Sequence, residues 1–188
     1  MRPGIWKQSF LVTAVTLLFC APAVPGDILD AEVAHADGRY QVSFDVLINA
    51  DKGRTWALMT DYERLPRLSR TITESRVLER QGDRLQRLRL TQRVCILFLC
   101  KDMRKTVHAA SRNKNDIVVV ADPTASDFRF SVEHWRVTAR DGRTRVQYAA
   151  VVEPDFFVPP LIGPWLVKSV LRREIEETLQ RLESLAAE

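Results

Sequence analysis

Hydrophobic positions along the chain follow two different periods, and each period predicts a different element. Apolar side chains recur at every second position over residues 40–48, which is typical of a strand with one buried face. After Pro164 they recur at every third or fourth position, which predicts an amphipathic helix of about five or six turns. A short helix ending near Thr60, and a second helical turn begun by Asp61, are predicted to follow the first strand.

Six further strands are predicted between the short helices and the long one. They cover residues 71–80, 84–94, 101–110, 116–121, 127–140 and 144–153. Asp141-Gly142 joins the last two and is typical of a two-residue hairpin turn. In the strand 84–94, Leu88 and Leu90 face one way and arginines face the other, as in an antiparallel sheet with one solvated face. A run of strands closed by a covering helix predicts an α+β domain.

The first 23 residues have the composition of a secretory signal peptide. Arg2 and Lys7 precede an uncharged stretch from Phe10 to Cys20, and the small residues Ala21-Pro22-Ala23 follow. We therefore expect cleavage and export, with the periplasm as the destination. An uncleaved membrane anchor is the alternative, but the apolar run is shorter than the roughly 20 residues of a membrane-spanning helix.

The rest of the chain is predicted to form one domain. Residues 24–39 are expected to be a lead-in segment, mobile or carrying one extra helical turn, and residues 40–188 the domain itself. Loss of Arg2 and Lys7 lowers the net charge from +4 by two units, to +2. No basic cluster stands out, so nucleic-acid binding is not expected.

Cys95 and Cys100 would be the two cysteines of the exported protein. An oxidising compartment permits a disulfide between them. On one continuous strand, however, residues five positions apart point to opposite faces and cannot bond. The intervening Ile-Leu-Phe-Leu is a poor turn sequence, so we expect two unpaired thiols.

The sequence carries no recognisable catalytic motif. It has no glycine-rich phosphate loop, no nucleophile elbow and no His-Glu-x-x-His, and its isolated histidines do not have the spacing of metal ligands. We expect no metal and no cofactor. His134 is the best candidate for an acid or base. It faces inward if it continues the row of Phe128 and Phe130, whereas a bulge would turn Trp135 inward instead.

Two apolar stretches interrupt the pattern. Cys95 to Cys100 is six consecutive non-polar residues, which either a fully buried strand or an exposed lip at a cavity mouth would explain. Phe156 to Ile162 contains two phenylalanines followed by two prolines. It either packs against the start of the final helix or forms a gate over a cavity.

Several segments together resemble the START/Bet v 1-like (SRPBCC) superfamily, in its bacterial polyketide cyclase/dehydrase and coenzyme Q-binding branch. These segments are Trp56, Thr60-Asp61-Tyr62-Glu63 with Leu65-Pro66, the strand containing Trp135, and the proline-rich stretch before the final helix. The resemblance covers about residues 40–186. It implies a helix-grip fold, in which a curved antiparallel sheet of about seven strands wraps around a long C-terminal helix and encloses a hydrophobic cavity.

The resemblance implies a binding protein that holds a lipid or isoprenoid quinone in that cavity. From strand phase and helix face we expect these ligand-binding residues: Leu65, Leu88, Leu90, Phe98, Met103, Phe130, His134, Tyr148, Trp165 and Leu166. The regions of Phe98 and Phe156-Phe157 are candidates for transient membrane contact. Two alternatives stay open: a cyclase or dehydratase acting on a polyketide-like substrate, and a structural envelope protein with a filled interior.

Overall fold

One antiparallel sheet forms the body of the protein, in the strand order β1-β2-β8-β7-β6-β5-β4-β3. The computed structural model describes residues 26–82, 84–96, 98–159 and 163–188. In chain order the elements are β1 (Asp27–Ala36), β2 (Arg39–Ile48), α1 (Lys52–Thr60), η1 (Tyr62–Arg67), β3 (Ile72–Gln81), β4 (Leu85–Ile96), β5 (Leu99–Arg112), β6 (Asp116–Ala121), η2 (Pro123–Ala125), β7 (Phe128–Arg140), β8 (Arg143–Pro154) and α2 (Pro164–Ala187).

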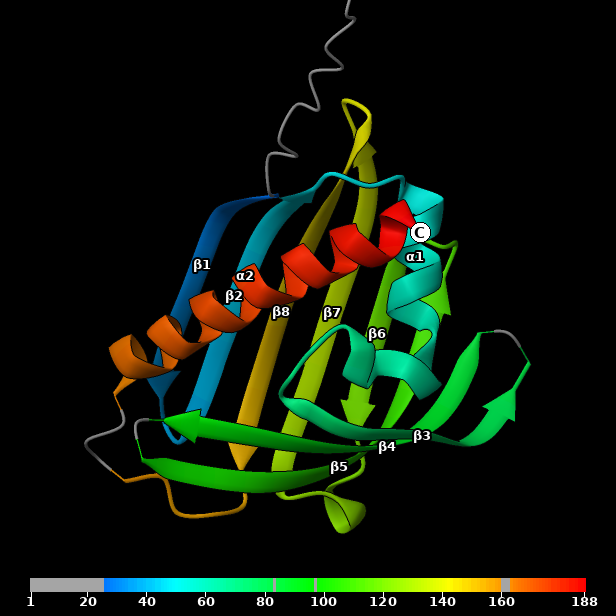
Figure 1. The fold of residues 1–188 in the computed structure, drawn as a ribbon. Coiled ribbons are helices and arrows are strands. Elements are labelled where there is room, and N and C mark those ends of the chain that lie inside the picture. Colours follow the sequence, from blue (N-terminus) through cyan, green and yellow to red (C-terminus); the bar gives the residue numbers. More distant parts are fainter. Residues whose placement is uncertain (1–25, 83, 97, 160–162) are drawn as a thin grey trace, which may run out of the picture.

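The long helix α2 crosses the sheet diagonally, and the sheet curves around it (Figure 1). The short helices α1 and η1 lie beside the C-terminal half of α2 (Figure 1). This arrangement is the predicted α+β helix-grip fold, and the start of α2 at Pro164 agrees with the prediction. Among the described residues, no helix is both long enough and apolar enough to cross a bilayer.

An eighth strand occupies the segment that was expected to be a lead-in. β1 pairs with β2 through a turn at Asp37-Gly38, where both residues have positive φ (52° and 76°). The predicted hairpin turn at Asp141-Gly142 has nearly the same backbone, with φ of 51° and 74°. Aspartate tolerates this left-handed conformation and glycine adopts it without steric cost. The two dipeptides therefore build the same kind of turn.

Side-chain to backbone hydrogen bonds stabilise the start of α1 and attach α2 to the sheet. The Asp51 carboxylate caps α1 by accepting from the backbone amides of Gly53 (2.7 Å) and Arg54 (3.1 Å). Glu183 near the end of α2 accepts from the backbone amides of Gly26 (3.2 Å) and Asn49 (2.7 Å). These two bonds tie the helix to the residues that flank β1 and β2.

The end of the β4–β5 hairpin corrects the expectation of two free thiols. Cys95 lies opposite Cys100 in the β4–β5 register, and the two form a disulfide. The prediction failed because Ile-Leu-Phe-Leu was judged a poor turn sequence, whereas the chain does reverse between the two cysteines. Leu97 lies outside the described residues, as do the predicted signal peptide and the segment Pro160 to Ile162.

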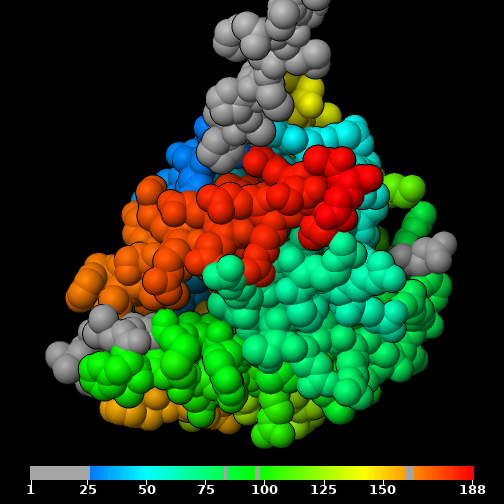
Figure 2. All heavy atoms as spheres, viewed as in Figure 1, coloured from blue at the N-terminus to red at the C-terminus, as the bar shows by residue number. Residues whose placement is uncertain are grey.

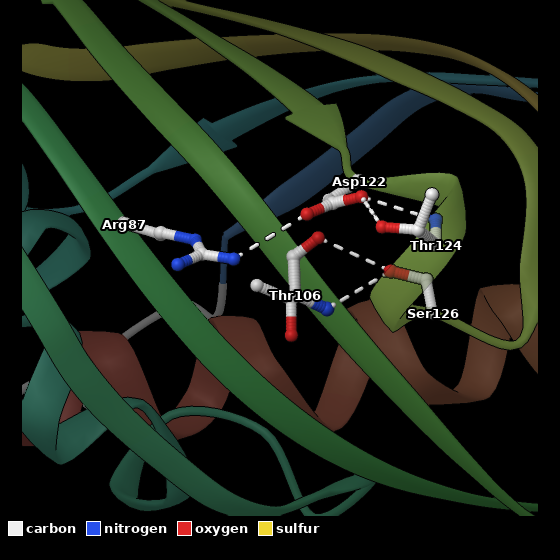
Figure 3. Close-up of polar contacts among 5 residues, drawn as sticks. All are labelled: Arg87, Thr106, Asp122, Thr124 and Ser126. Atoms are coloured by element: carbon white, nitrogen blue, oxygen red, sulfur yellow. Dashed lines mark hydrogen bonds and ion pairs between the residues drawn. The ribbon is translucent and has the colours of Figure 1, made fainter.

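The η2 connection between β6 and β7 is held to β5 by polar contacts (Figure 3). The hydroxyl of Ser126 accepts from the Thr106 amide (3.0 Å) and donates to the Thr106 carbonyl (3.1 Å). Asp122 accepts from the amide and hydroxyl of Thr124 (3.0 and 2.7 Å) and pairs with Arg87 at 3.4 Å. These contacts fix the backbone beside Lys105, the neighbour of Thr106, which faces the opposite side of the sheet.

Candidate ligand-binding cavity

A cavity of about 430 Å³ lies between α2 and the concave face of the sheet. Figure 2 shows α2 (orange to red) as a ridge over this face, with the β4–β5 hairpin (green) below its first half. Most of the lining side chains are aliphatic or aromatic and come from the inward rows of the strands, from η1 and from α2. The volume is within the range of about 300 to 1,000 Å³ found for small-molecule sites.

Three aromatic rings from neighbouring strands form a patch on the cavity wall. Tyr148 lies with its ring centre 4.3 Å from Trp135 and 4.8 Å from Phe44, and the Phe44–Trp135 distance is 5.7 Å. Phe44 is on β2, Trp135 on β7 and Tyr148 on β8, and all three line the cavity. Such edge and stacked contacts stabilise the rings in fixed positions. The patch is a rigid apolar surface against which a ligand can pack.

An ion pair lies in the mostly apolar cavity. Lys105 of β5 and Glu133 of β7 both line it and bond to each other across β6. Their side chains are only 6% and 15% exposed. Lys105 Nζ also lies 5.0 Å from the ring centre of Phe128. Desolvating two charges costs several kcal/mol per ion in proteins, so a buried pair is weak evidence for stability, and its position in the lining makes it a candidate for ligand contact.

Tyr148 connects the aromatic patch to the ion pair. Burial raises the pKa of the Tyr148 hydroxyl well above its ordinary value, and the charge of Glu133 and a hydrogen bond to that carboxylate raise it further. Burial likewise raises the pKa of Tyr62, which also lines the cavity, to about 12. Both hydroxyls are therefore protonated at neutral pH. Tyr148 acts as a donor to Glu133.

A second polar group lies on the helix side of the cavity. Glu174 of α2 accepts from the hydroxyls of Ser69 (2.5 Å), Thr71 (3.3 Å) and Thr178 (3.5 Å). The Ser69 and Thr71 hydroxyls also lie 2.8 Å apart, and because each has a single proton, Thr71 donates either to Ser69 or to Glu174. These hydrogen bonds connect α2 to the segment between η1 and β3, so they fix the helix over the cavity.

Four of the residues predicted from the sequence line the cavity: Leu65, Leu88, Leu90 and Tyr148. Met103 shares the strand face of Lys105 but lies two residues nearer the hairpin end, and Leu166 is buried. Neither is part of the lining. Phe98 at the hairpin end and Trp165 in the first turn of α2 point outward, with 86% and 71% of their surface exposed.

His134 and Phe130 lie on the outer face of the sheet, which corrects their predicted placement. The β7–β8 register shifts between Phe128 and Phe130. This bulge leaves Phe128 inward and turns the following residues by one position, so that Trp135 faces the cavity. His134 Nε2 instead lies 3.3 Å from Asp116, and the Phe130 ring packs under Arg39 at 4.9 Å. The alternative with a bulge, which the sequence left open, is the correct one.

Lys105, Glu133 and Glu174 also line the cavity but were not predicted from the sequence. Lys105 alternates with Val107 and Ala109, and Glu133 with Trp135, so each charge stands in an inward strand row. Lys105 and Glu133 could have been recognised from the sequence as charged residues within a predicted apolar row. Within the described part of the chain, no three His, Cys, Asp or Glu side chains gather in the manner of a metal site.

Comparison with known proteins agrees with this architecture. The family model described as polyketide cyclase / dehydrase and lipid transport matches residues 39–187. No curated protein sequence shows significant similarity to the chain.

Solved structures share the fold at low sequence identity. TTHA0849 from Thermus thermophilus is 21% identical, with a TM-score of 0.63 over 78% of this chain and 97% of that one. The Zhui aromatase/cyclase from Streptomyces sp. R1128 is 16% identical, with a TM-score of 0.61 over 79% and 94%. A STAR-related lipid transfer protein from Xanthomonas axonopodis is 14% identical, with a TM-score of 0.62 over 84% and 99%. At these identities the similarity establishes the fold alone.

Proposed function

The chain belongs to the polyketide cyclase / dehydrase and lipid transport family, in the START/Bet v 1-like superfamily, and we propose that it is an exported protein that holds a lipid or isoprenoid quinone under α2. The observation that carries the proposal is the apolar cavity of about 430 Å³ with its aromatic patch. The names of the structural neighbours, a lipid transfer protein among them, are consistent with it.

Burial of apolar surface would supply most of the affinity. A ligand that removes roughly 200 Å² of its apolar surface from water gains about 5 kcal/mol, part of which offsets the entropy lost on binding. The aromatic rings and the helix are already fixed by their own contacts, so little ordering is needed. An interior with this much open volume does not support the hypothesis of a structural protein with a filled core.

Native mass spectrometry tests the proposal directly. The protein is purified from its own envelope, its intact mass is measured, and bound compounds are extracted. We expect an apolar compound in near-stoichiometric amount. The proposal fails if the folded protein carries no such compound and also takes up none from added lipid or quinone.

Export is tested on the same preparation. Sequencing of the mature N-terminus from a periplasmic extract is expected to give Val24, the residue after Ala23. Recovery of a chain that begins at Met1 in the membrane fraction would support the anchor alternative.

Membrane contact is proposed through the exposed residues beside the cavity. Phe98 is 86% and Phe157 80% exposed, which is unusual for aromatic side chains. Lys101 lies over Phe156 at 5.0 Å, so the hairpin end and the segment after β8 are in contact. Flotation with anionic vesicles tests this: Phe98→Ser with Phe157→Ser is expected to lower the bound fraction. An equal bound fraction would contradict the contact.

An enzyme of the cyclase or dehydratase type is the second candidate, and the Lys105–Glu133 pair is the observation that favours it. A carboxylate beside an ammonium group can take a proton from a carbon next to a carbonyl while the ammonium group donates to the carbonyl oxygen. His134 is no longer the candidate because it lies outside the cavity. Turnover of a polyketide-like ketone that is lost in Glu133→Gln, with affinity retained, would establish this activity.

A further inference from the structure

The ion pair in the cavity leaves specific hydrogen-bonding capacity unused. The Lys105 ammonium group has three N–H donors. One bonds to Glu133, and the cation also contacts the face of the Phe128 ring. The structure gives Lys105 no further hydrogen-bond acceptor among the described residues.

Ser131 provides a second unused polar atom. It lies two residues before Glu133 on β7, on the same face of the strand, and is 2% exposed. Its Oγ has no hydrogen-bond partner in the described part of the protein. Buried polar atoms are nearly always paired, but Ser131 is not part of the cavity lining and its Oγ is closed off, so this hydroxyl is not counted among the groups that a ligand can reach.

The charge balance limits what that partner can be. Lys105 and Glu133 neutralise each other, and the Tyr148 hydroxyl is kept neutral beside them. A ligand carboxylate that bonds to Lys105 would stand close to the Glu133 carboxylate, where like charges repel strongly because little water screens them. An uncharged oxygen accepts the same bond without that repulsion.

We infer that Lys105, Glu133 and Tyr148 form a polar head-group site for an uncharged apolar ligand with a hydrogen-bond-accepting oxygen, of the ketone or ester class. The inference rests on the proposed binding function and adds the chemistry of the ligand. The ligand oxygen accepts from Lys105, and the apolar part of the ligand packs on the Phe44–Trp135–Tyr148 patch.

Three probes of one chain length test the inference: a linear methyl ketone, the alkane and the fatty acid anion at neutral pH. Their affinities are measured by displacement of a fluorescent apolar dye. We expect the ketone to bind about tenfold more tightly than the alkane, since a hydrogen bond from a charged donor has roughly that effect. The fatty acid anion is expected to bind no more tightly than the alkane.

The double variant Lys105→Met with Glu133→Leu removes the charges together and so avoids an unpaired one. It is expected to lose the tenfold preference for the ketone over the alkane. The matched control, Asp116→Leu with Arg136→Met, removes an ion pair from the outer face (3.0 Å) and should keep the preference.

The outcomes separate the two proposals. If none of the probes binds, the binding function itself fails. If the alkane binds as tightly as the ketone, or the fatty acid anion binds most tightly, the head-group inference is overturned while the binding function stands. Should the double variant not fold, the carbonyl carbon resonance of a ¹³C-labelled ketone gives a second test on the unaltered protein. A downfield shift on binding is expected, and its absence contradicts the hydrogen bond.

Discussion

Both faces of strand β7 carry titratable side chains close to an oppositely charged group on a neighbouring strand, but the two faces differ greatly in their exposure to water. On the inner face, Glu133 pairs with Lys105 inside the cavity, and both side chains are largely withdrawn from water. On the outer face, Arg136 pairs with Asp116 and His134 Nε2 lies 3.3 Å from the same carboxylate, and the His134 and Arg136 side chains are 42% and 54% exposed. Each charge of the inner pair is stabilised by its partner because little water reaches it. Water solvates the charges on the outer face whether or not their partners are present.

The difference in solvent exposure distinguishes the cavity face of β7 from its outer face. Charges on the outer face cost little to place and contribute little to stability. The inner pair persists in the cavity despite its desolvation cost, so changes on the inner face are expected to affect both stability and binding. The following predictions run from the largest expected effect to the smallest.

Lys105→Met should have the largest effect. It leaves Glu133 buried without its partner, and breaking a buried pair in this way costs about 3 to 5 kcal/mol of unfolding free energy. Urea denaturation measures the loss. The double variant with Glu133→Leu should return to within about 1 kcal/mol of the unaltered protein. A single variant as stable as the double one would show that the pair is not desolvated.

Trp135→Ala should lower both stability and affinity. Removing a partly buried aromatic side chain costs about 2 to 3 kcal/mol, somewhat less than in a filled core because one side of the ring faces the cavity. The affinity for an apolar ligand should fall about tenfold as the aromatic patch is lost. Trp135→Phe is the control and should retain most of both. Unchanged affinity in the alanine variant would remove Trp135 from the site.

Alkaline titration should distinguish the inner tyrosines from free tyrosine. The chain has three, and burial raises the pKa of each: Tyr40, Tyr62 (to about 12) and Tyr148. Tyrosinate absorbance at pH 10 should therefore be lower than that of three free tyrosines while the fold persists. The pKa of these hydroxyls is higher in the folded than in the unfolded protein. Their contribution to the unfolding free energy is therefore complete below the unfolded value near 10, and it is lost as the pH rises through the folded values. Half-ionisation at pH 10 in the folded protein would contradict the burial.

Asp45→Asn, a change on the outer face of the sheet, should lower the unfolding free energy modestly. A hydrogen bond from Arg145 lowers the pKa of the Asp45 carboxyl, with Gln147 contributing. A lowered pKa stabilises the fold above the unfolded value of about 4, and this contribution is lost as the pH falls through the folded value. The variant should lose about 1 kcal/mol at neutral pH. The difference from the unaltered protein should vanish in acid; a constant difference would mean that the carboxylate charge is irrelevant.

His134→Ala should have the smallest effect. The imidazole is on the outer face beside Asp116, so the unfolding free energy should change by less than about 0.5 kcal/mol. Ligand affinity should not change. A clear loss of affinity, measured with the same dye displacement, would place His134 in the site after all.

Much of the fold could be predicted because the patterns that determine it are local. The period-2 rows, the turn at Asp141-Gly142 and the helical spacing after Pro164 correspond to observed elements. The eighth strand was missed although Asp37-Gly38 carries the same turn residues. The segment before that turn lacks a clear alternation, because β1 is exposed along most of its length.

The site was predicted less completely, since it depends on register and on long-range pairing. One bulge in β7 exchanged His134 for Trp135 at the cavity, because a shift of one residue turns every later side chain to the other face. The disulfide required a chain reversal within an apolar stretch that has no turn residues. Neither event leaves a mark in the local hydrophobic pattern.

The sequence by itself determined the kinds of element, their order and the α+β class, because backbone propensity and side-chain period act over a few residues. Only the tertiary structure decided which side chains meet. Lys105 and Glu133 are 28 positions apart and come together across β6. Glu183 reaches Gly26 over 157 positions. Such contacts depend on which strands pair and on how the sheet packs against α2. Both are properties of the whole chain and not of any short segment.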